Sequence, residues 1–125
     1  MKDKKLILAA AGAVNLRPDT SFKNGGGRGN DGFNICGNLV LDWHNSTTWN
    51  PLENDTDAFK LVVDLGLLVH VEINEVDRQT EVVWNNCYHQ GGKVRIQHDD
   101  DPYQATRLAI TMAAAAIYEN TPLHP

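Results

Sequence analysis

LLVHVEINEVDRQTEVVWNNCYHQGGKVRIQH, residues 67–98, is the segment that says most about the fold. Its first seven residues alternate in character, so that Val69, Val71 and Ile73 fall on one face of a strand. Two similar runs follow after short polar links, and the predicted strands are residues 67–73, 80–84 and 93–98. Links this short join antiparallel neighbours, because a parallel pair needs a long crossover. The segment therefore predicts a three-stranded antiparallel meander.

A helix is predicted before the meander. It begins at Asn54 or Asp55, since short polar side chains cap helix N-termini, and it ends at Gly66, since glycine adopts the left-handed conformation at C-termini. The apolar residues recur at helical spacing and are expected to face a sheet. They are Ala58, Leu61, Val62 and Leu65, with Phe59 and Val63 widening the stripe.

A second helix is predicted after the meander. Asp101 is its expected cap, and Pro102 occupies the first helical position, where a missing N–H costs nothing. The expected inward residues are Ala105, Leu108, Ala109, Met112, Ala113 and Ala116. The run of alanines at residues 113–116 carries no bulk, so a neighbouring backbone is able to approach closely.

The N-terminal segment is predicted to form another helix. Asp3 is the expected cap, Leu6, Ala9, Ala10 and Ala13 the buried stripe, and Asn15 and Pro18 the end. The basic start and short apolar run also have the character of a signal peptide. The helix is the favoured interpretation, and a cytoplasmic location follows from it. Beyond it, residues 33–43 are expected to form one strand or extended segment.

Composition narrows the class of protein. The 125 residues are 42% hydrophobic and 22% charged, which suits a single globular domain over residues 1–125. No run of about 20 apolar residues is present, so a membrane span and a membrane partner are not expected. A net charge of −5 argues against extensive nucleic-acid binding. Together the elements predict an α+β domain, with a three- to four-stranded, mainly antiparallel sheet and helices packed on it.

Two motifs were considered for ligand chemistry. His98, Asp99, Asp100 and Asp101 form a run of metal-ligand types, but the ligand spacing of known metal motifs is missing, so no metal and no cofactor are predicted. The glycine-rich residues 23–32 contain Arg28, and backbone N–H groups of such a loop are able to cradle a phosphate. The Lys-Ser/Thr and the helix of a Walker motif do not follow. A mobile, solvated loop is therefore the favoured interpretation.

Nucleophilic catalysis has weaker support. A recognisable nucleophile motif is missing around the candidate residues, which are Cys36, Cys87, Ser21 and Ser46, so the protein is expected not to be an enzyme.

Trp49 precedes the helix that begins near Asn54. It is interpreted as packing with Leu52 at the helix entry rather than as a base-stacking residue.

Polar side chains gather on the face of the meander opposite to Val69. They are His70, Glu72, Arg95 and Gln97. If helices covered both faces of the sheet, these groups would have to satisfy one another or bind a ligand, because an unpaired buried polar group costs about 1–3 kcal/mol. Arg95 and Arg28, with His70 and Gln97, are therefore the predicted contacts of any anionic ligand.

Three segments resemble a known family. They are WNPLENDTDAFKLVVDLG, residues 49–66, DPYQATRLAITMAAA, residues 101–115, and DKKLILAAAGAV, residues 3–14. They are similar to segments of the phage "ABA sandwich" family of small bacteriophage and prophage proteins. The resemblance implies a phage origin and a sheet with helices on both sides, and it lends no catalytic residues. The glycine-rich loop around Arg28 departs from the family pattern.

The hypothesis that follows is a small phage or prophage accessory protein in the cytoplasm of the bacterial host. It is expected to act by binding, with a host protein or a small anionic, nucleotide-type ligand as partner. One alternative is a metal-dependent hydrolase or nuclease that uses His98, Asp99 and Asp100. Another is a structural subunit of a homo-oligomer, in which residues 113–116 pack against a second copy.

Overall fold

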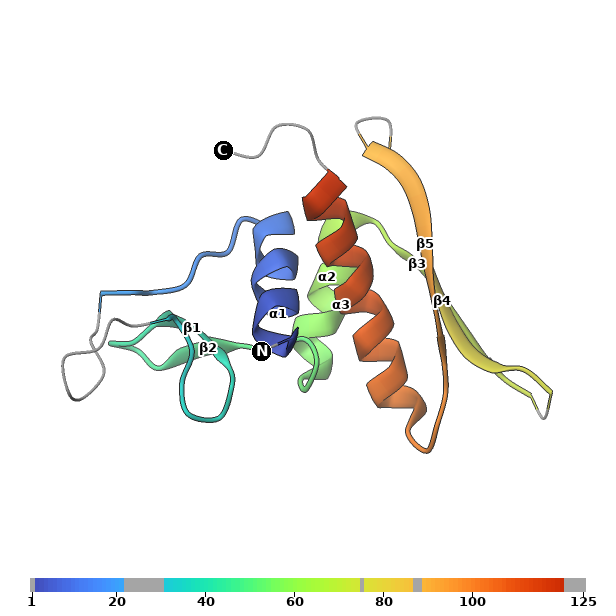
Figure 1. The fold of residues 1–125 in the computed structure, drawn as a ribbon, viewed down its shortest axis with the longest axis horizontal. Helices are drawn as coiled ribbons and strands as arrows, with labels where there is room; N and C mark the ends of the chain where they lie inside the picture. The colour runs from blue at the N-terminus through green and yellow to red at the C-terminus, as the bar shows by residue number, and fades with distance from the viewer. Residues whose placement is uncertain (1, 22–30, 75, 87–88, 121–125) are drawn as a thin grey trace.

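The computed structural model describes residues 2–21, 31–74, 76–86 and 89–120. Figure 1 shows the order of the elements along the chain. They are α1 (Lys2–Ala13), β1 (Leu39–Asp42), β2 (Thr47–Trp49), α2 (Asp55–Leu65), β3 (Leu68–Ile73), β4 (Arg78–Asn86), β5 (His89–Gln97) and α3 (Pro102–Asn120). The glycine-rich residues 23–30 and Arg28 lie outside the described residues.

The predicted antiparallel meander is confirmed. The sheet has the order β3-β4-β5, and both pairs of strands are antiparallel. The registers align Val69 with Val82 and Val94, and His70 with Glu81 and Arg95. Strands β4 and β5 are longer than predicted, because backbone pairing continues through polar and glycine residues where the alternation of side chains gives no signal.

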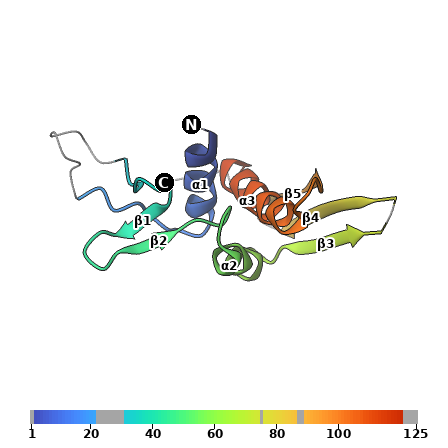
Figure 2. The ribbon, with the colours of Figure 1, turned by 90° about the horizontal axis from the view of Figure 1, so that it is seen from below.

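Helix α3 lies at the centre of the molecule, between the β3–β5 sheet and α1 (Figures 1 and 2). The predicted cap is confirmed, since Oδ1 of Asp101 accepts hydrogen bonds from the backbone N–H groups of Tyr103 and Gln104. Contact on several sides buries more of the helix than one stripe: Ala105, Ala109, Ile110, Thr111, Ala113, Ala114, Ala115 and Ile117. Leu108 and Met112 are only partly buried.

Helix α2 has the predicted ends. The Asn54 side chain accepts a hydrogen bond from the Asp57 N–H, and Gly66 closes the helix with a φ of 64°. Ala58 and Leu61 are buried, and Val62 and Leu65 are partly buried. The prediction that Phe59 and Val63 widen the buried stripe is wrong, because both are more than 60% exposed. The helix packs mainly against α3, and Phe59 and Val63 lie on its exposed side.

Helix α1 is rotated relative to the prediction. Its buried residues are Ile7, Ala10 and Ala11, and Asp3 lies inside the first turn instead of capping it. Asn15 adopts a positive φ of 61° just beyond the helix, and the Leu16 N–H donates back to the Ala11 carbonyl. The buried residues of α1 pack on α3, because the alanines of α3 allow the two helices to approach closely. A side chain at Gly12 would collide with the Tyr118 ring.

A small hairpin lies on the far side of α1 from the sheet (Figure 1). The strand predicted over residues 33–43 is wrong in extent: Phe33 makes an isolated bridge to Leu39, and a turn holding the fully exposed Ile35 separates the bridge from β1. Strand β2 was not predicted, because its two exposed threonines show no apolar alternation. Trp49 at its end is buried, as the interpretation of a packing residue requires.

Asn50 joins this hairpin to α2. Its Nδ2 donates to Oδ1 of Asn38 over 2.9 Å, its Oδ1 accepts from the Leu52 N–H, and its own N–H donates to Oδ2 of Asp57. The residue is only 7% exposed, so each polar atom of the side chain has a partner where water is excluded. The segment between β2 and α2 is therefore fixed by hydrogen bonds as well as by Trp49.

The α+β class with helices packed on an antiparallel sheet is confirmed. The two-sided coverage implied by the family resemblance is not seen in the described residues: the helices lie on one side of the β3–β5 sheet, and its other face carries none (Figures 1 and 2). The polar character of that outer face agrees with contact with solvent. None of the helices in the described ranges has the length and hydrophobicity that crossing a bilayer requires.

Candidate binding surface

An apolar groove of about 610 Å³ lies where α2, β3 and α3 meet. Strand β3 leaves the end of α2 and extends beyond the helices (Figure 2). The inner side of β3 thus forms one wall, and α2 and α3 form the others. The lining residues are Asp55, Ala58, Phe59, Val62, Val69, Val71, Ile73, Pro102, Tyr103, Thr106, Arg107 and Ile110.

Large apolar side chains in this groove are open to solvent. Phe59 is 65% exposed, Ile73 67% and Tyr103 71%. They come from three different elements, so local sequence preference does not explain why they gather. Burying a side chain of this size stabilises a protein by about 1.5–3 kcal/mol, and the fold leaves that gain unused here. Exposed apolar patches of this kind mark interaction surfaces.

Arg107 is the charged group at the groove. Its Nε donates to the Leu52 carbonyl over 2.9 Å, and its Nη1 forms a 2.7 Å ion pair with Oδ1 of Asp55. The guanidinium side chain is 15% exposed. These bonds join α3 to the start of α2 and hold both sides of the groove in a fixed relation. A rigid wall of this kind reduces the entropy lost when a ligand binds.

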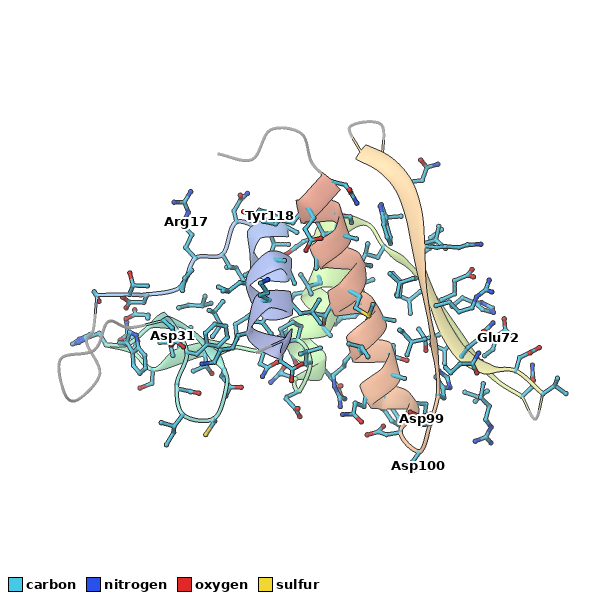
Figure 3. The ribbon with its side chains drawn as sticks, in the orientation of Figure 1. Arg17, Asp31, Glu72, Asp99, Asp100 and Tyr118 are labelled. Carbon is cyan, nitrogen blue, oxygen red and sulfur yellow. The ribbon has the colours of Figure 1, made fainter. Side chains whose placement is uncertain are left out.

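The outer face of the sheet carries the predicted polar residues. His70, Glu72, Arg95 and Gln97 share one face, as predicted, because their register positions have the same parity. Figure 3 shows Glu72 on the side of the sheet away from the helices. Arg95 donates through Nη2 and Nε to Oε2 of Glu81, at 2.6 and 3.2 Å. The hydrogen bond from Arg95 lowers the pKa of Glu81 below its ordinary value and raises the pKa of Arg95.

This pairing weakens the case for an anion site on the outer face. Arg95 is already bound to a carboxylate and is half exposed, whereas the prediction depended on a covered face. His70 Nε2 lies 3.3 Å from Oε1 of Glu72, and Gln97 reaches Gln79 at 3.5 Å. The groups therefore satisfy one another or contact solvent. The structure brings Arg95, His70 and Gln97 to one face but does not place Arg28, which lies outside the described residues.

The predicted metal-ligand types do not converge. His98 turns inward, and its Nε2 lies 2.7 Å from Oγ1 of Thr80. Asp101 caps α3, and Asp99 and Asp100 are exposed at the turn between β5 and α3 (Figure 3). A polar hollow of about 420 Å³ includes these aspartates. Within the described ranges, no three His, Cys, Asp or Glu side chains are arranged to hold a metal ion.

A third hollow, of about 810 Å³, lies between the C-terminal halves of α1 and α3 and the segment after α1. Arg17 and Tyr118 are on its rim (Figure 3). It mixes polar and apolar groups, including Lys5 and Glu119.

The alanine run 113–116 is not a free surface. Ala113, Ala114 and Ala115 are buried and Ala116 is partly buried, because α1 packs on this helix. A second copy therefore has no access to most of this segment while α1 is in place. The groove, by contrast, was missed from the sequence, since an apolar residue at helical spacing gives the same signal whether its neighbour is in the chain or in another molecule.

Comparisons with known proteins add no identification. No protein-family model, no curated protein and no solved structure matches the chain. Function therefore has to be argued from the surfaces described above.

Proposed function

We propose that this protein is a small phage or prophage accessory protein that acts by binding another polypeptide, and that the groove between α2, β3 and α3 is its binding surface. The observation that carries the proposal is the group of exposed apolar side chains around a groove of about 610 Å³. The family resemblance of residues 49–66 and 101–115 supports a phage origin and a partner in the cytoplasm of the bacterial host.

The chemistry of the groove favours a polypeptide over a nucleotide. Phe59, Ile73 and Tyr103 offer apolar contacts, and Arg107 is held by Asp55 and the Leu52 carbonyl. A phosphate needs cations or N–H groups that are free to bind it. An apolar segment of a host protein needs a groove with a few polar groups at the margin, which is what the described residues provide.

The experiment is capture from host lysate with matched variants. Phe59→Glu and Tyr103→Glu place charges in the groove at exposed positions, so the fold is expected to survive. Ile35→Glu is the control, because Ile35 is a fully exposed apolar residue in a turn remote from the groove in sequence and structure. Mass spectrometry of bound proteins should show a partner that wild type and Ile35→Glu retain and both groove variants lose.

The opposite result has a clear meaning. If the folded groove variants retain the same proteins as wild type, or if wild type retains nothing that the variants lack, the groove is not a polypeptide-binding surface. Circular dichroism and thermal melting of each variant establish that a lost partner reflects lost contacts and not unfolding.

A further inference from the structure

The two edges of the β3–β5 sheet differ in chemistry. The β5 edge carries Lys93 and Arg95, and charged side chains of this kind discourage pairing with another strand. Strand β3 instead exposes Leu68 (71%), Val71 (44%) and Ile73 (67%). In the described part of the chain no strand pairs with its free edge. An exposed apolar edge strand is a template for strand addition.

We infer that a second copy of this chain occupies this edge, through antiparallel pairing of β3 with the partner subunit's β3 about a two-fold axis at Val71. In this register Val71 lies opposite the partner's Val71, and Val69 lies opposite the partner's Ile73. Two three-stranded sheets then become one six-stranded sheet. The inference goes beyond the proposed function, because it uses the backbone edge of β3 rather than the groove contacts.

Side-chain parity selects this kind of register. Directly opposed residues of an antiparallel pair lie on the same face of the sheet. Pairing about Val71 keeps Val69, Val71 and Ile73 of both copies on the inner face, beside the grooves, while Leu68 lies on the outer face opposite the partner's Asn74. A shift by one residue would place apolar side chains opposite polar ones and turn one copy over. Antiparallel pairing of β3 with its own copy is therefore limited to registers in which the two-fold axis lies at a residue. In such a register the numbers of any two paired residues add up to an even number.

The polar residues of the outer face select among those registers. Pairing about Val71 sets His70 opposite the partner's Glu72 and Glu72 opposite the partner's His70, so that each cross-strand pair joins a histidine to a carboxylate. Pairing about His70 would instead oppose two histidines and place Leu68 against the partner's Glu72. A histidine ring N–H is able to donate to a carboxylate oxygen of the residue opposite, and cross-strand pairs of this kind stabilise a sheet. The two side chains contact each other at 3.3 Å within one chain, and their exposed fractions, 67% for His70 and 30% for Glu72, leave both within reach of a partner on the outer face.

Sedimentation of charge variants tests the inference. Wild type should show a monomer–dimer equilibrium. Glu72→Lys should weaken dimerisation about tenfold, because each His70 loses the carboxylate opposite it. The double variant His70→Glu/Glu72→Lys should recover dimerisation, because the swap restores an opposite-charge pair about Val71. About His70, the same swap would oppose two glutamates and weaken the dimer further.

Disulfide trapping tests the register directly. With Cys36 and Cys87 replaced by serine, Val71→Cys brings two thiols opposite each other, within the Cα separation that a disulfide allows. Mild oxidation should convert this variant to a covalent dimer. Ile73→Cys is the matched control: its position on the same strand faces the partner's Val69, and two such thiols lie too far apart to join.

A monomer at all concentrations up to about 1 mM, or equal trapping of both cysteine variants, would overturn the inference. Failure here is distinct from failure of the proposed function. Lysate capture depends on Phe59 and Tyr103, whereas dimerisation depends on His70, Glu72 and the β3 backbone. A monomer that still loses its host partner on Phe59→Glu would refute only the dimer.

Discussion

Leu61 and Phe59 are two apolar residues of α2 that differ in burial. Leu61 is 1% exposed and belongs to the main hydrophobic core, whereas Phe59 is 65% exposed. Leu61→Ala removes buried methyl and methylene groups worth about 0.8 kcal/mol each and leaves a cavity whose penalty adds to the transfer free energy. The expected loss in the free energy of unfolding is about 3–4 kcal/mol, a large share of the 5–15 kcal/mol typical of a domain.

Urea denaturation at constant pH measures this difference. Leu61→Ala should lower the midpoint without a change in the denaturant slope, which would show that stability and not the unfolded state has changed. Phe59→Ala should change the free energy of unfolding by no more than about 0.5 kcal/mol, because surface substitutions rarely do more. Equal losses for the two variants would mean that Phe59 is packed as Leu61 is, and the groove would then lose an exposed aromatic side chain.

Three further outcomes are expected. Asp101→Ala should lower the free energy of unfolding by about 0.5–2 kcal/mol through loss of the α3 cap, and an unchanged melting temperature would contradict that role. Gly12→Val should cost about 1–3 kcal/mol by overpacking, because a Cβ there would lie 2.5 Å from Cε1 of Tyr118; thermal melting checks it. Acid should destabilise the fold, because a lowered Glu81 pKa stabilises it above the ordinary value of 4.5 and this contribution is lost as pH falls through the folded-state pKa. Melting temperatures from pH 7 to 3 should fall less steeply for Glu81→Gln.

Local chemistry made some elements predictable. The caps at Asn54, Gly66 and Asp101 depend only on neighbouring backbone groups, so the ends of α2 and the start of α3 followed from the sequence. The burial of Thr111 could not be predicted from local sequence chemistry. It is fully buried at a position that the apolar stripe omitted, and it is tolerated because its hydroxyl donates to the Arg107 carbonyl one turn earlier. A polar residue can therefore enter the core whenever its own helix satisfies it.

The remaining features depend on contacts between elements that are distant in the sequence. The face that α1 buries depends on the close approach of α3, and the cover over the outer sheet face was inferred from a family resemblance rather than from residues of the sheet. The same limit applies to the candidate site. Register parity places His70 and Arg95 on one face, but only the structure shows Arg95 paired with Glu81 at 2.6 Å. Arg95 thus lies on the predicted face, and the anion contact itself stays a prediction, in a less favourable electrostatic environment than expected.

Exposed apolar side chains and unpaired strand backbone occur together on one side of the described part of the molecule. On the outer sheet face, Arg95 and Glu81 neutralise each other, and the residues around them contact water without cost. Around the free edge of β3, by contrast, apolar side chains from two helices and a strand remain exposed beside unpaired strand backbone. Apolar area and backbone hydrogen bonds are the two contributions that strand addition supplies together. A partner that binds at this edge gains both contributions together, so the groove and the β3 edge are where interaction with another chain should be sought first.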